Sequence, residues 1–185
     1  VTPTGNPLSN LNEPIDFAAC TPFQINQILQ ENPEKLNLIH TLIIGGGVLE
    51  EHLIKKLNEN WVTTKCYSTF GMTESITHIA LRKINGTDKE AFFRTLPNVT
   101  VFKTDQQTLA ISVPYIQTEP IITNDLIELL DEHRFIWKGR IDFVINSGGV
   151  KLFPEQMEDK IRSIMGTVNY YFSKESHPTL GEVPV

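Results

Sequence analysis

The sequence has few cysteines, no long apolar run and no cluster of basic residues. Its only two cysteines, Cys20 and Cys66, lie in apolar or β-like runs, so we expect reduced, buried thiols in a cytoplasmic protein and no disulfide framework. No run reaches the ~18–20 apolar residues of a membrane span, and residues 1–7 have neither the basic region nor the apolar core of a secretory signal. The 16 Lys and Arg against 22 Asp and Glu give a formal charge of −6, and without a basic cluster we expect no nucleic-acid partner.

The rest of the composition is that of an ordinary globular protein. The chain has 185 residues, of which 40% are hydrophobic and 21% are charged. A chain of this length can bury roughly 70% of its unfolded surface, which is enough for a sizeable core. We therefore expect one domain, or one domain and part of another.

The front half alternates between β-branched runs and helical patterns. Thr21-Pro22 is typical of a helix start, because the hydroxyl can cap free N–H groups and proline suits the first helical position. Leucines at 49, 53 and 57 form a helical stripe with Glu50 and Glu51 in its first turn. The predicted strands are residues 15–20, 41–44 and 62–67, and the predicted helices begin at Pro22 and near Leu49. This order predicts a layered α/β fold.

The second half has the short runs and turns of an antiparallel sheet. These runs are residues 99–102, 109–113, 127–130 and 135–137. Residues 143–146 predict a further strand, and Pro154 begins a helix that Gly166 can end. The apolar stripe of that helix is Met157, Ile161 and Ile164.

Gly45, Gly46 and Gly47 lie between a predicted strand and a predicted helix. Glycines let a backbone approach a flat or anionic ligand, and a helix N-terminus offers free N–H groups. No Gly-Lys-Ser/Thr follows, which excludes a Walker loop, and Glu50 stands where a dinucleotide fingerprint has a small residue. A tight strand-to-helix turn is the alternative interpretation.

Residues 67–75 bring an aromatic ring, a glycine, a hydroxyl and a carboxylate together after a strand. A ring can stack on a base, a hydroxyl can donate to a phosphate oxygen and a carboxylate can hold Mg²⁺. The alternative is that Thr73 or Ser75 only caps a short helix. A third cluster spans residues 138–158, and upstream of it Asp125 follows an extended run, where it could accept from sugar hydroxyls.

These clusters together resemble the adenylate-forming superfamily, which includes acyl-CoA synthetases, luciferases and the adenylation domains of peptide synthetases. Phe70-Gly71-Met72-Thr73-Glu74 resembles its (Tyr/Phe)-Gly-x-Thr-Glu signature, and Thr123-Asn124-Asp125 is similar to its Thr-Gly-Asp motif, with Asn124 in place of glycine. Residues 139–142 and 149–158 resemble its hinge-and-lid motif, and the glycines at 45–47 fall where it has an adenine loop. Within the superfamily, Ser147-Gly148-Gly149 and residues 16–24 resemble the o-succinylbenzoate–CoA ligases of menaquinone synthesis.

The resemblance implies both a fold and an activity. It implies an α/β fold in which residues 1–141 are the C-terminal portion of the large adenylating domain, a layered sheet plus a small antiparallel subdomain, and residues 142–185 begin a small α+β lid. It implies an ATP-dependent ligase that activates a carboxylic acid, o-succinylbenzoate, as an acyl-adenylate with Mg²⁺, transfers the acyl group to coenzyme A and releases AMP. Another small acyl-CoA synthetase is the alternative.

The resemblance also implies a role for each matching residue. Phe70 would stack on adenine beside Gly71, and Gly45, Gly46 and Gly47 would line the same pocket. Thr73 would bond the phosphate and Glu74 would hold Mg²⁺, while Asp125 would accept from the ribose hydroxyls and Arg140 would reach the ribose or phosphate. Asp142 would be the hinge of the lid, and the loop that lines the thiol tunnel would contain Ser147, Gly148, Gly149 and Lys151.

Two features of the superfamily have no match here. Nothing in residues 1–23 resembles its phosphate loop, and no lysine has the context of the catalytic lysine at the far end of its lid. We therefore expect the chain to be a fragment and a poor catalyst alone. A non-catalytic nucleotide-binding module and an α/β domain with accidental motif matches are the alternatives.

Overall fold

A computed structural model describes residues 8, 10–60, 63–165 and 170–185. The chain divides into two compact units, Val1–Pro97 and Asn98–Val185. Both units contain residues of the predicted site.

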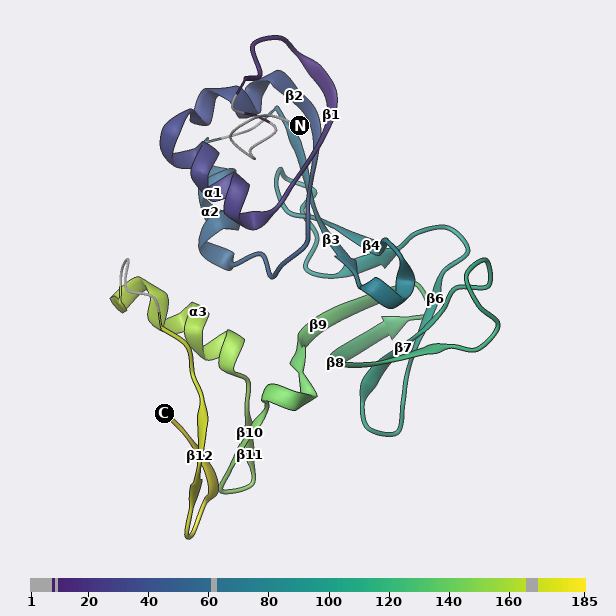
Figure 1. Ribbon diagram of the computed structural model, residues 1–185, viewed down its shortest axis with the longest axis vertical. Helices are drawn as coiled ribbons and strands as arrows, with labels where there is room; N and C mark the ends of the chain where they lie inside the picture. Colours follow the sequence, from purple (N-terminus) through teal and green to yellow (C-terminus); the bar gives the residue numbers. More distant parts are fainter. Residues whose placement is uncertain (1–7, 9, 61–62, 166–169) are drawn as a thin grey trace. The chain divides into compact units, whose positions relative to one another are not determined.

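The first unit consists of β1 (Ile15–Cys20), α1 (Pro22–Glu31), the 3₁₀ helix η1 (Pro33–Leu38), β2 (Ile39–Ile44), α2 (Glu51–Asn60), β3 (Lys65–Gly71), the 3₁₀ turn η2 (Thr73–Ser75), β4 (His78–Lys83) and β5 (Phe93–Thr95). Its sheet has the order β1-β2-β3-β4-β5. The pairs β1–β2 and β2–β3 are parallel, whereas β4 is antiparallel to both β3 and β5. Figure 1 shows α1 and α2 on the same side of the strands. The predicted α/β fold is confirmed.

Helix α1 begins where the sequence predicts. The Thr21 hydroxyl accepts the Gln24 N–H at 3.3 Å, and the Gln24 side chain accepts the Thr21 N–H at 2.8 Å. This reciprocal capping satisfies two N–H groups at the helix start. The core beneath joins both helices to the strands through Ile25, Ile28, Leu42, Ile44, Leu53, Leu57 and Cys66. Both cysteines are free and buried, and burial raises the pKa of Cys20 to about 11 and that of Cys66 to about 12.

A buried asparagine joins the start of β3 to the end of β4. Asn85 is 2% exposed; its Oδ1 accepts the Cys66 N–H at 2.9 Å and its Nδ2 donates to the Thr64 carbonyl at 2.7 Å. The Thr64 hydroxyl in turn donates to the Leu36 carbonyl at 2.6 Å. The Asn85 side chain thus provides hydrogen-bond partners for the Cys66 N–H and the Thr64 carbonyl, which strand pairing does not provide.

We expect Asn85→Leu to lower the free energy of unfolding by about 2–4 kcal/mol, because it leaves a buried N–H and a buried carbonyl without partners. Urea unfolding followed by circular dichroism measures the loss. Asn37→Leu is the control, since Asn37 is exposed and its side chain accepts an exposed hydroxyl, that of Thr63. Equal effects of the two substitutions would contradict this account of Asn85.

The second unit contains two antiparallel sheets and one α-helix: β6 (Thr100–Lys103), β7 (Thr108–Ser112), β8 (Ile121–Asp131), β9 (Arg134–Arg140), the 3₁₀ turn η3 (Ile141–Phe143), β10 (Ile145–Ser147), β11 (Val150–Leu152), α3 (Pro154–Met165), β12 (Lys174–His177) and β13 (Gly181–Pro184). β6 to β9 follow the order β9-β8-β7-β6, and the smaller sheet has the order β11-β10-β13-β12. The domain boundary predicted at residue 142 falls within η3, between the two sheets, and stays a prediction.

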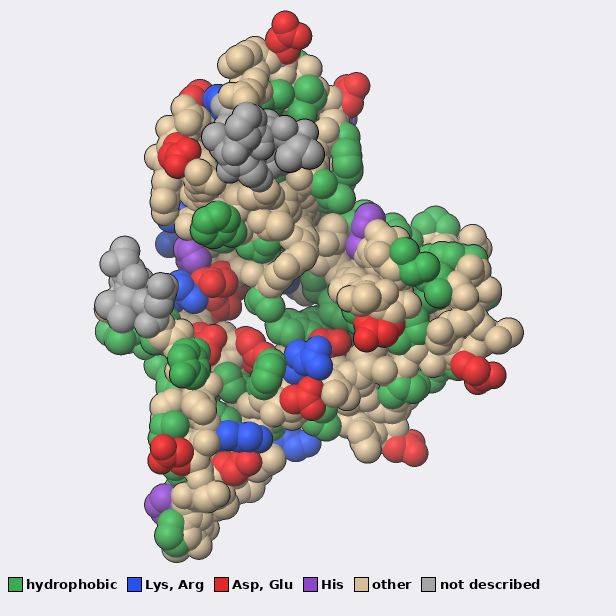
Figure 2. Space-filling model, in the orientation of Figure 1, with side chains coloured by type: hydrophobic (Ala, Val, Ile, Leu, Met, Phe, Trp, Pro, Cys, Tyr) green, Lys and Arg blue, Asp and Glu red, His purple; other side chains and the backbone are tan. Residues whose placement is uncertain are grey.

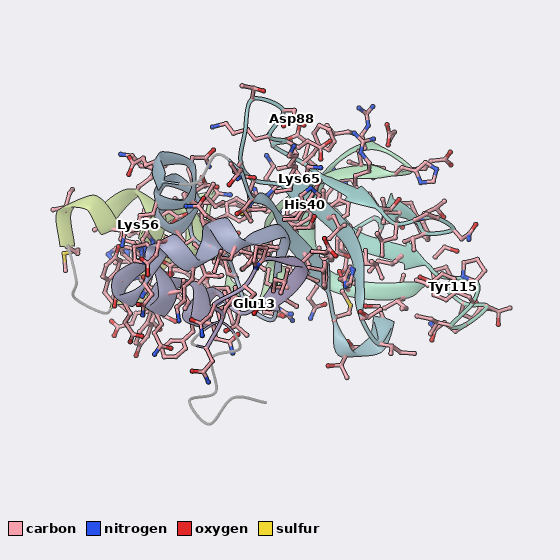
Figure 3. The ribbon with its side chains drawn as sticks, turned by 90° about the horizontal axis from the view of Figure 1, so that it is seen from above. Glu13, His40, Lys56, Lys65, Asp88 and Tyr115 are labelled. Carbon is pink, nitrogen blue, oxygen red and sulfur yellow. The ribbon has the colours of Figure 1, made fainter. Side chains whose placement is uncertain are left out.

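Each unit has a loop between neighbouring strands that carries a labelled residue in Figure 3. Asp88 lies in the connection between β4 and β5, where it pairs with Lys83 at 2.6 Å, and Tyr115 is exposed in the connection between β7 and β8 (Figure 3).

Several predicted elements are shifted. Helix α2 begins at Glu51, because the Glu50 carbonyl accepts its first N–H groups; Leu49 and Glu50 therefore precede the helix. β3 covers Lys65–Gly71 in place of residues 62–67, of which residue 62 lies outside the described residues. Phe143 is in η3, so the strand begins at Ile145. On α3, Met157 and Ile161 are half-buried, whereas Ile164 is 81% exposed, so the predicted apolar stripe is not fully covered; Gly166 lies outside the described residues.

Candidate active site

The carboxyl ends of three parallel strands lie at one edge of the first sheet. Strand β1 ends at Cys20 before α1, β2 ends at Ile44 before the glycines, and Ile44 lies opposite Ser68 on β3. The Gly45 N–H donates to the Cys20 carbonyl at 3.0 Å. Ligands of open α/β sheets bind outside this edge. The glycine loop after β2 and residues 70–74 at the end of β3 therefore lie at the edge where a ligand site is expected.

Two of the three glycines are needed by the fold itself. A Cβ on Gly45 would lie 2.0 Å from the Thr69 Oγ1, and Gly46 has a φ of +78° that disfavours other residues. Gly47 has room, since its nearest neighbour would be a Pro22 ring carbon at 3.8 Å. The tight turn considered above thus explains Gly45 and Gly46. The exposed backbone of Gly46 and Gly47 stays available to a ligand.

Phe70 and Gly71 end β3 beside a break in its pairing with β4. The half-buried Phe70 ring packs against Phe93 with centroids 5.6 Å apart. A Cβ on Gly71 would lie 2.5 Å from the His78 Cα and 2.6 Å from the Thr77 carbonyl oxygen, and the register shifts between Phe70 and Gly71. The absence of a side chain at Gly71 therefore allows the end of β3 to approach the backbone of residues 77–78 closely, and this contact fixes the position of Phe70 next to the end of the strand.

Thr73 and Glu74 form the exposed 3₁₀ turn that follows. Ser75 makes the capping bonds of this turn, accepting the Met72 N–H at 3.1 Å and lying 2.8 Å from the Thr77 carbonyl. The capping alternative therefore holds for Ser75, and the Thr73 side chain is exposed. Glu74 is also exposed, and a carboxylate is a ligand that Mg²⁺ prefers. The carboxylate chemistry of Glu74 and its exposure to solvent are thus compatible with the predicted role as a magnesium ligand.

In the second unit, Asp125 is 8% exposed and held in place from two sides. Its Oδ1 accepts the Trp137 indole N–H at 2.8 Å, and its own N–H donates to the Thr123 hydroxyl at 3.1 Å. Trp137 therefore orients the carboxylate that is predicted to bind ribose.

Arg140 and Asp142 are brought together at the end of β9. Arg140 lies opposite Asp125 in the strand register, and its guanidinium bonds the Asp142 carboxylate at 3.0 Å. This ion pair and a bond from Asn124 hold the pKa of Asp142 below its usual value. Arg140 therefore contacts the predicted hinge residue directly, while its contact with ribose or phosphate stays a prediction.

The predicted tunnel loop is a tight hairpin. Ser147 pairs with Val150 across Gly148 and Gly149, whose φ angles of +57° and +85° suit a two-residue turn. The Gly148 N–H donates to the Leu180 carbonyl at 2.8 Å, and exposed Lys151 lies on β11. The glycines are thus required by the hairpin, and a role in thiol binding stays a prediction.

Glu155 lies in the first turn of α3, and the sequence alone predicts no individual role for it. Its Oε2 is buried without a hydrogen-bond partner, close to where a Cβ on Gly139 would lie. Burial raises the pKa of Glu155, although its own N–H, the Arg140 N–H and the Arg140 charge act to lower it. Desolvation therefore outweighs the favourable N-terminal position in the helix.

We expect Glu155→Gln to stabilise the protein at pH 7 by a few tenths of a kcal/mol to about 1 kcal/mol, a range that allows for the partial exposure of the side chain. The pKa of Glu155 is higher in the folded protein than in the unfolded chain, where it is near 4.3. The protonated carboxyl therefore favours folding below about pH 4.3, and this stabilisation is lost as the pH rises through the pKa of the folded protein. The gain should therefore vanish near pH 3.5. Urea unfolding at both pH values checks it, with exposed Glu175→Gln as control; an equal gain at both would contradict the burial argument.

Each of the two units, taken by itself, brings a local group of predicted residues together. The glycine loop and residues 70–74 lie together in the first unit; Asp125, Arg140 and Asp142 lie together in the second. Among the described residues there is no cluster of histidines, cysteines and carboxylates suited to a metal ion. None of the described helices has the length and apolar character needed to cross a membrane.

Comparisons with known proteins extend these observations. No protein-family model matches the chain. A 3,4-dihydroxybenzoate–[aryl-carrier protein] ligase from Bacillus anthracis is 26% identical over 161 residues, which is 84% of this chain and 37% of the relative. The chain therefore spans well under half of that protein.

Solved structures agree with this likeness. An acyl-CoA synthetase (AMP-forming)/AMP-acid ligase II-like protein from Dyadobacter fermentans is 28% identical, with a TM-score of 0.67, over 100% of this chain and 54% of its own. The o-succinylbenzoate coenzyme A synthetase of Bacillus subtilis, solved with ATP and a magnesium ion, has a TM-score of 0.73 at 19% identity, over 92% of this chain and 40% of its own. At that identity the second match supports the fold alone.

Proposed function

We propose that this chain belongs to the adenylate-forming superfamily and that the protein is an ATP-dependent acid–thiol ligase. The observation that carries the proposal is the position of residues 70–74, which form the end of β3 and the turn after it, at the carboxyl edge of the parallel strands beside the glycine loop. The likeness to the Dyadobacter protein along the whole chain supports it.

In the first half-reaction, a carboxylate oxygen of the acid attacks the α-phosphorus of ATP and pyrophosphate leaves. The Phe70 ring would stack on adenine, the Thr73 hydroxyl would donate to a phosphate oxygen and Asp125, oriented by Trp137, would accept from the ribose hydroxyls. Glu74 would hold Mg²⁺, which when bound supplies charge neutralisation for the phosphates. Arg140 adds a positive charge beside Asp125 in the strand register.

In the second half-reaction, a thiolate attacks the acyl carbon and AMP leaves with the oxygen that came from the acid. We propose coenzyme A as the thiol and the hairpin at residues 147–149, with Lys151, as its contact surface. A carrier-protein thiol is the alternative that the Bacillus anthracis relative favours. Asp142 would mark the hinge about which the lid turns between the two steps.

We further propose an aromatic acid of the o-succinylbenzoate type as substrate, as in menaquinone synthesis. The Ser147-Gly148-Gly149 sequence and residues 16–24, which resemble the o-succinylbenzoate–CoA ligases, support this choice. Another small acyl-CoA synthetase substrate is the alternative.

Exchange of labelled pyrophosphate into ATP by the full-length protein tests the proposal. We expect exchange only when an acid is present, fastest with o-succinylbenzoate among a panel that includes 3,4-dihydroxybenzoate, benzoate and acetate. Faster exchange with another acid would keep the ligase and overturn the substrate. ATP binding without exchange by any acid would support a non-catalytic nucleotide-binding module instead.

A further inference from the structure

An asparagine side chain bonds the predicted hinge residue from the neighbouring strand. The Asn124 Nδ2 lies 3.2 and 3.0 Å from the two carboxylate oxygens of Asp142. Arg140 donates to the same carboxylate at 3.0 Å. Two residues from different strands therefore hold one carboxylate of η3.

The alternation of side chains along β8 gives Asn124 this position. Asp125 points to Trp137, and Asn124, the preceding residue on the strand, points to the other side and reaches Asp142. Figure 2 shows acidic and basic side chains side by side over the segment that joins β9 to β10. The strand that carries the predicted ribose acceptor is thus tied to the predicted hinge.

We propose that Asn124 is a positioning residue that fixes η3 against β8 and favours the observed hinge conformation over alternatives; this role in the reaction rests on the proposed function. A glycine at this position has no side chain to donate, so the bond exists only because asparagine replaces the glycine of the motif that residues 123–125 resemble. Asn124 and Arg140 each donate to Asp142, while Lys174 adds a positive charge nearby.

The expected effect follows from the strength of such a bond. Loss of one hydrogen bond from an amide to a carboxylate, when both groups are exposed, changes a two-state equilibrium by about fivefold. Loss of Asn124 should therefore shift the population of hinge conformations by about three- to tenfold.

NMR of the 185-residue chain tests the contact without nucleotide. In Asn124→Ala we expect the pKa of Asp142 to rise toward its ordinary value, and the Val144 amide, which donates to Ile141 at 3.3 Å, to exchange at least about threefold faster. Asn124→Asp should have larger effects, because two carboxylates then face each other. In the double variant N124D/D142N the amide and carboxylate are exchanged, and Val144 exchange should return toward the wild-type rate.

The control is Asn146→Ala, an exposed asparagine on β10. Unchanged Asp142 titration and Val144 exchange in Asn124→Ala would overturn the positioning role, and so would a double variant that fails to restore slow exchange.

A rate ratio in the full-length protein tests the consequence. We expect Asn124→Ala to change the ratio of thioester formation to adenylation by about three- to tenfold, and Asn146→Ala to leave it unchanged. An unchanged ratio in an active Asn124→Ala protein would overturn the role in the reaction. If no acid supports adenylation while the NMR effects persist, the proposed function fails and the positioning of Asp142 stands.

Discussion

Replacing Glu74 with glutamine is expected to slow acid-dependent pyrophosphate exchange in the full-length protein by about a hundredfold or more. The substitution keeps the size of the side chain and removes the negative charge that would hold Mg²⁺ beside the phosphates. Because Glu74 is exposed in a three-residue turn, the folded structure should not depend on this carboxylate. The unfolding transition should therefore be unchanged while the exchange rate collapses.

Two comparisons make this result specific. Glu34→Gln, which removes an exposed carboxylate from η1, should leave exchange within about twofold of the wild type. Raising the Mg²⁺ concentration should partly restore the rate of Glu74→Gln, since a weaker site fills at higher concentration. Exchange within threefold of wild type in Glu74→Gln would remove Glu74 from the magnesium site.

Replacing Gly45 with alanine is expected to lower the free energy of unfolding by about 1–3 kcal/mol, because the new methyl group would fall on the Thr69 hydroxyl. A Cβ at residue 45 would lie 2.0 Å from Thr69 Oγ1, so the ends of β2 and β3 must move apart or Thr69 must leave its rotamer. Urea unfolding of the 185-residue chain measures the loss.

A second substitution should relieve this collision. Thr69→Ala removes the hydroxyl and leaves its Cβ at 3.3 Å, so the double variant G45A/T69A should recover about 1 kcal/mol or more. Gly47→Ala is the matched control and should cost less than about 0.5 kcal/mol, since its nearest neighbour is 3.8 Å away. Additive effects of the two substitutions would show that Gly45 is not required for the approach of the two strands.

Local features of the fold could be predicted because short-range chemistry specifies them. Thr21 and Pro22 start α1 through bonds and backbone angles within one turn, and Pro154 is the first residue of α3. The hairpin at Gly148 and Gly149 likewise depends on the backbone freedom of those two residues. For the same reason the first unit could be predicted as an α/β layer, because its strands and helices alternate in the sequence.

Contacts between distant residues could not be predicted in this way. Nothing in the local sequence indicates that Asn85 completes the pairing of Cys66, or that Trp137 orients Asp125. The collision between a side chain at residue 45 and Thr69 depends on how β2 pairs with β3, which the local sequence does not specify. Strand β5 has only three residues, which are too few to give a sequence pattern. The replacement of glycine by Asn124 was visible, but its contact with Asp142 required the structure.

Oxygen-isotope transfer tests the central claim most directly. The full-length protein is incubated with ATP, Mg²⁺, coenzyme A and o-succinylbenzoate labelled with ¹⁸O in its carboxylates, and the nucleotide product is analysed by mass spectrometry. Attack of the acid on the α-phosphorus predicts AMP that carries one ¹⁸O atom, because thiolysis leaves the former carboxylate oxygen on phosphorus. Unlabelled AMP, or ADP with ¹⁸O in inorganic phosphate, would contradict an acyl-adenylate.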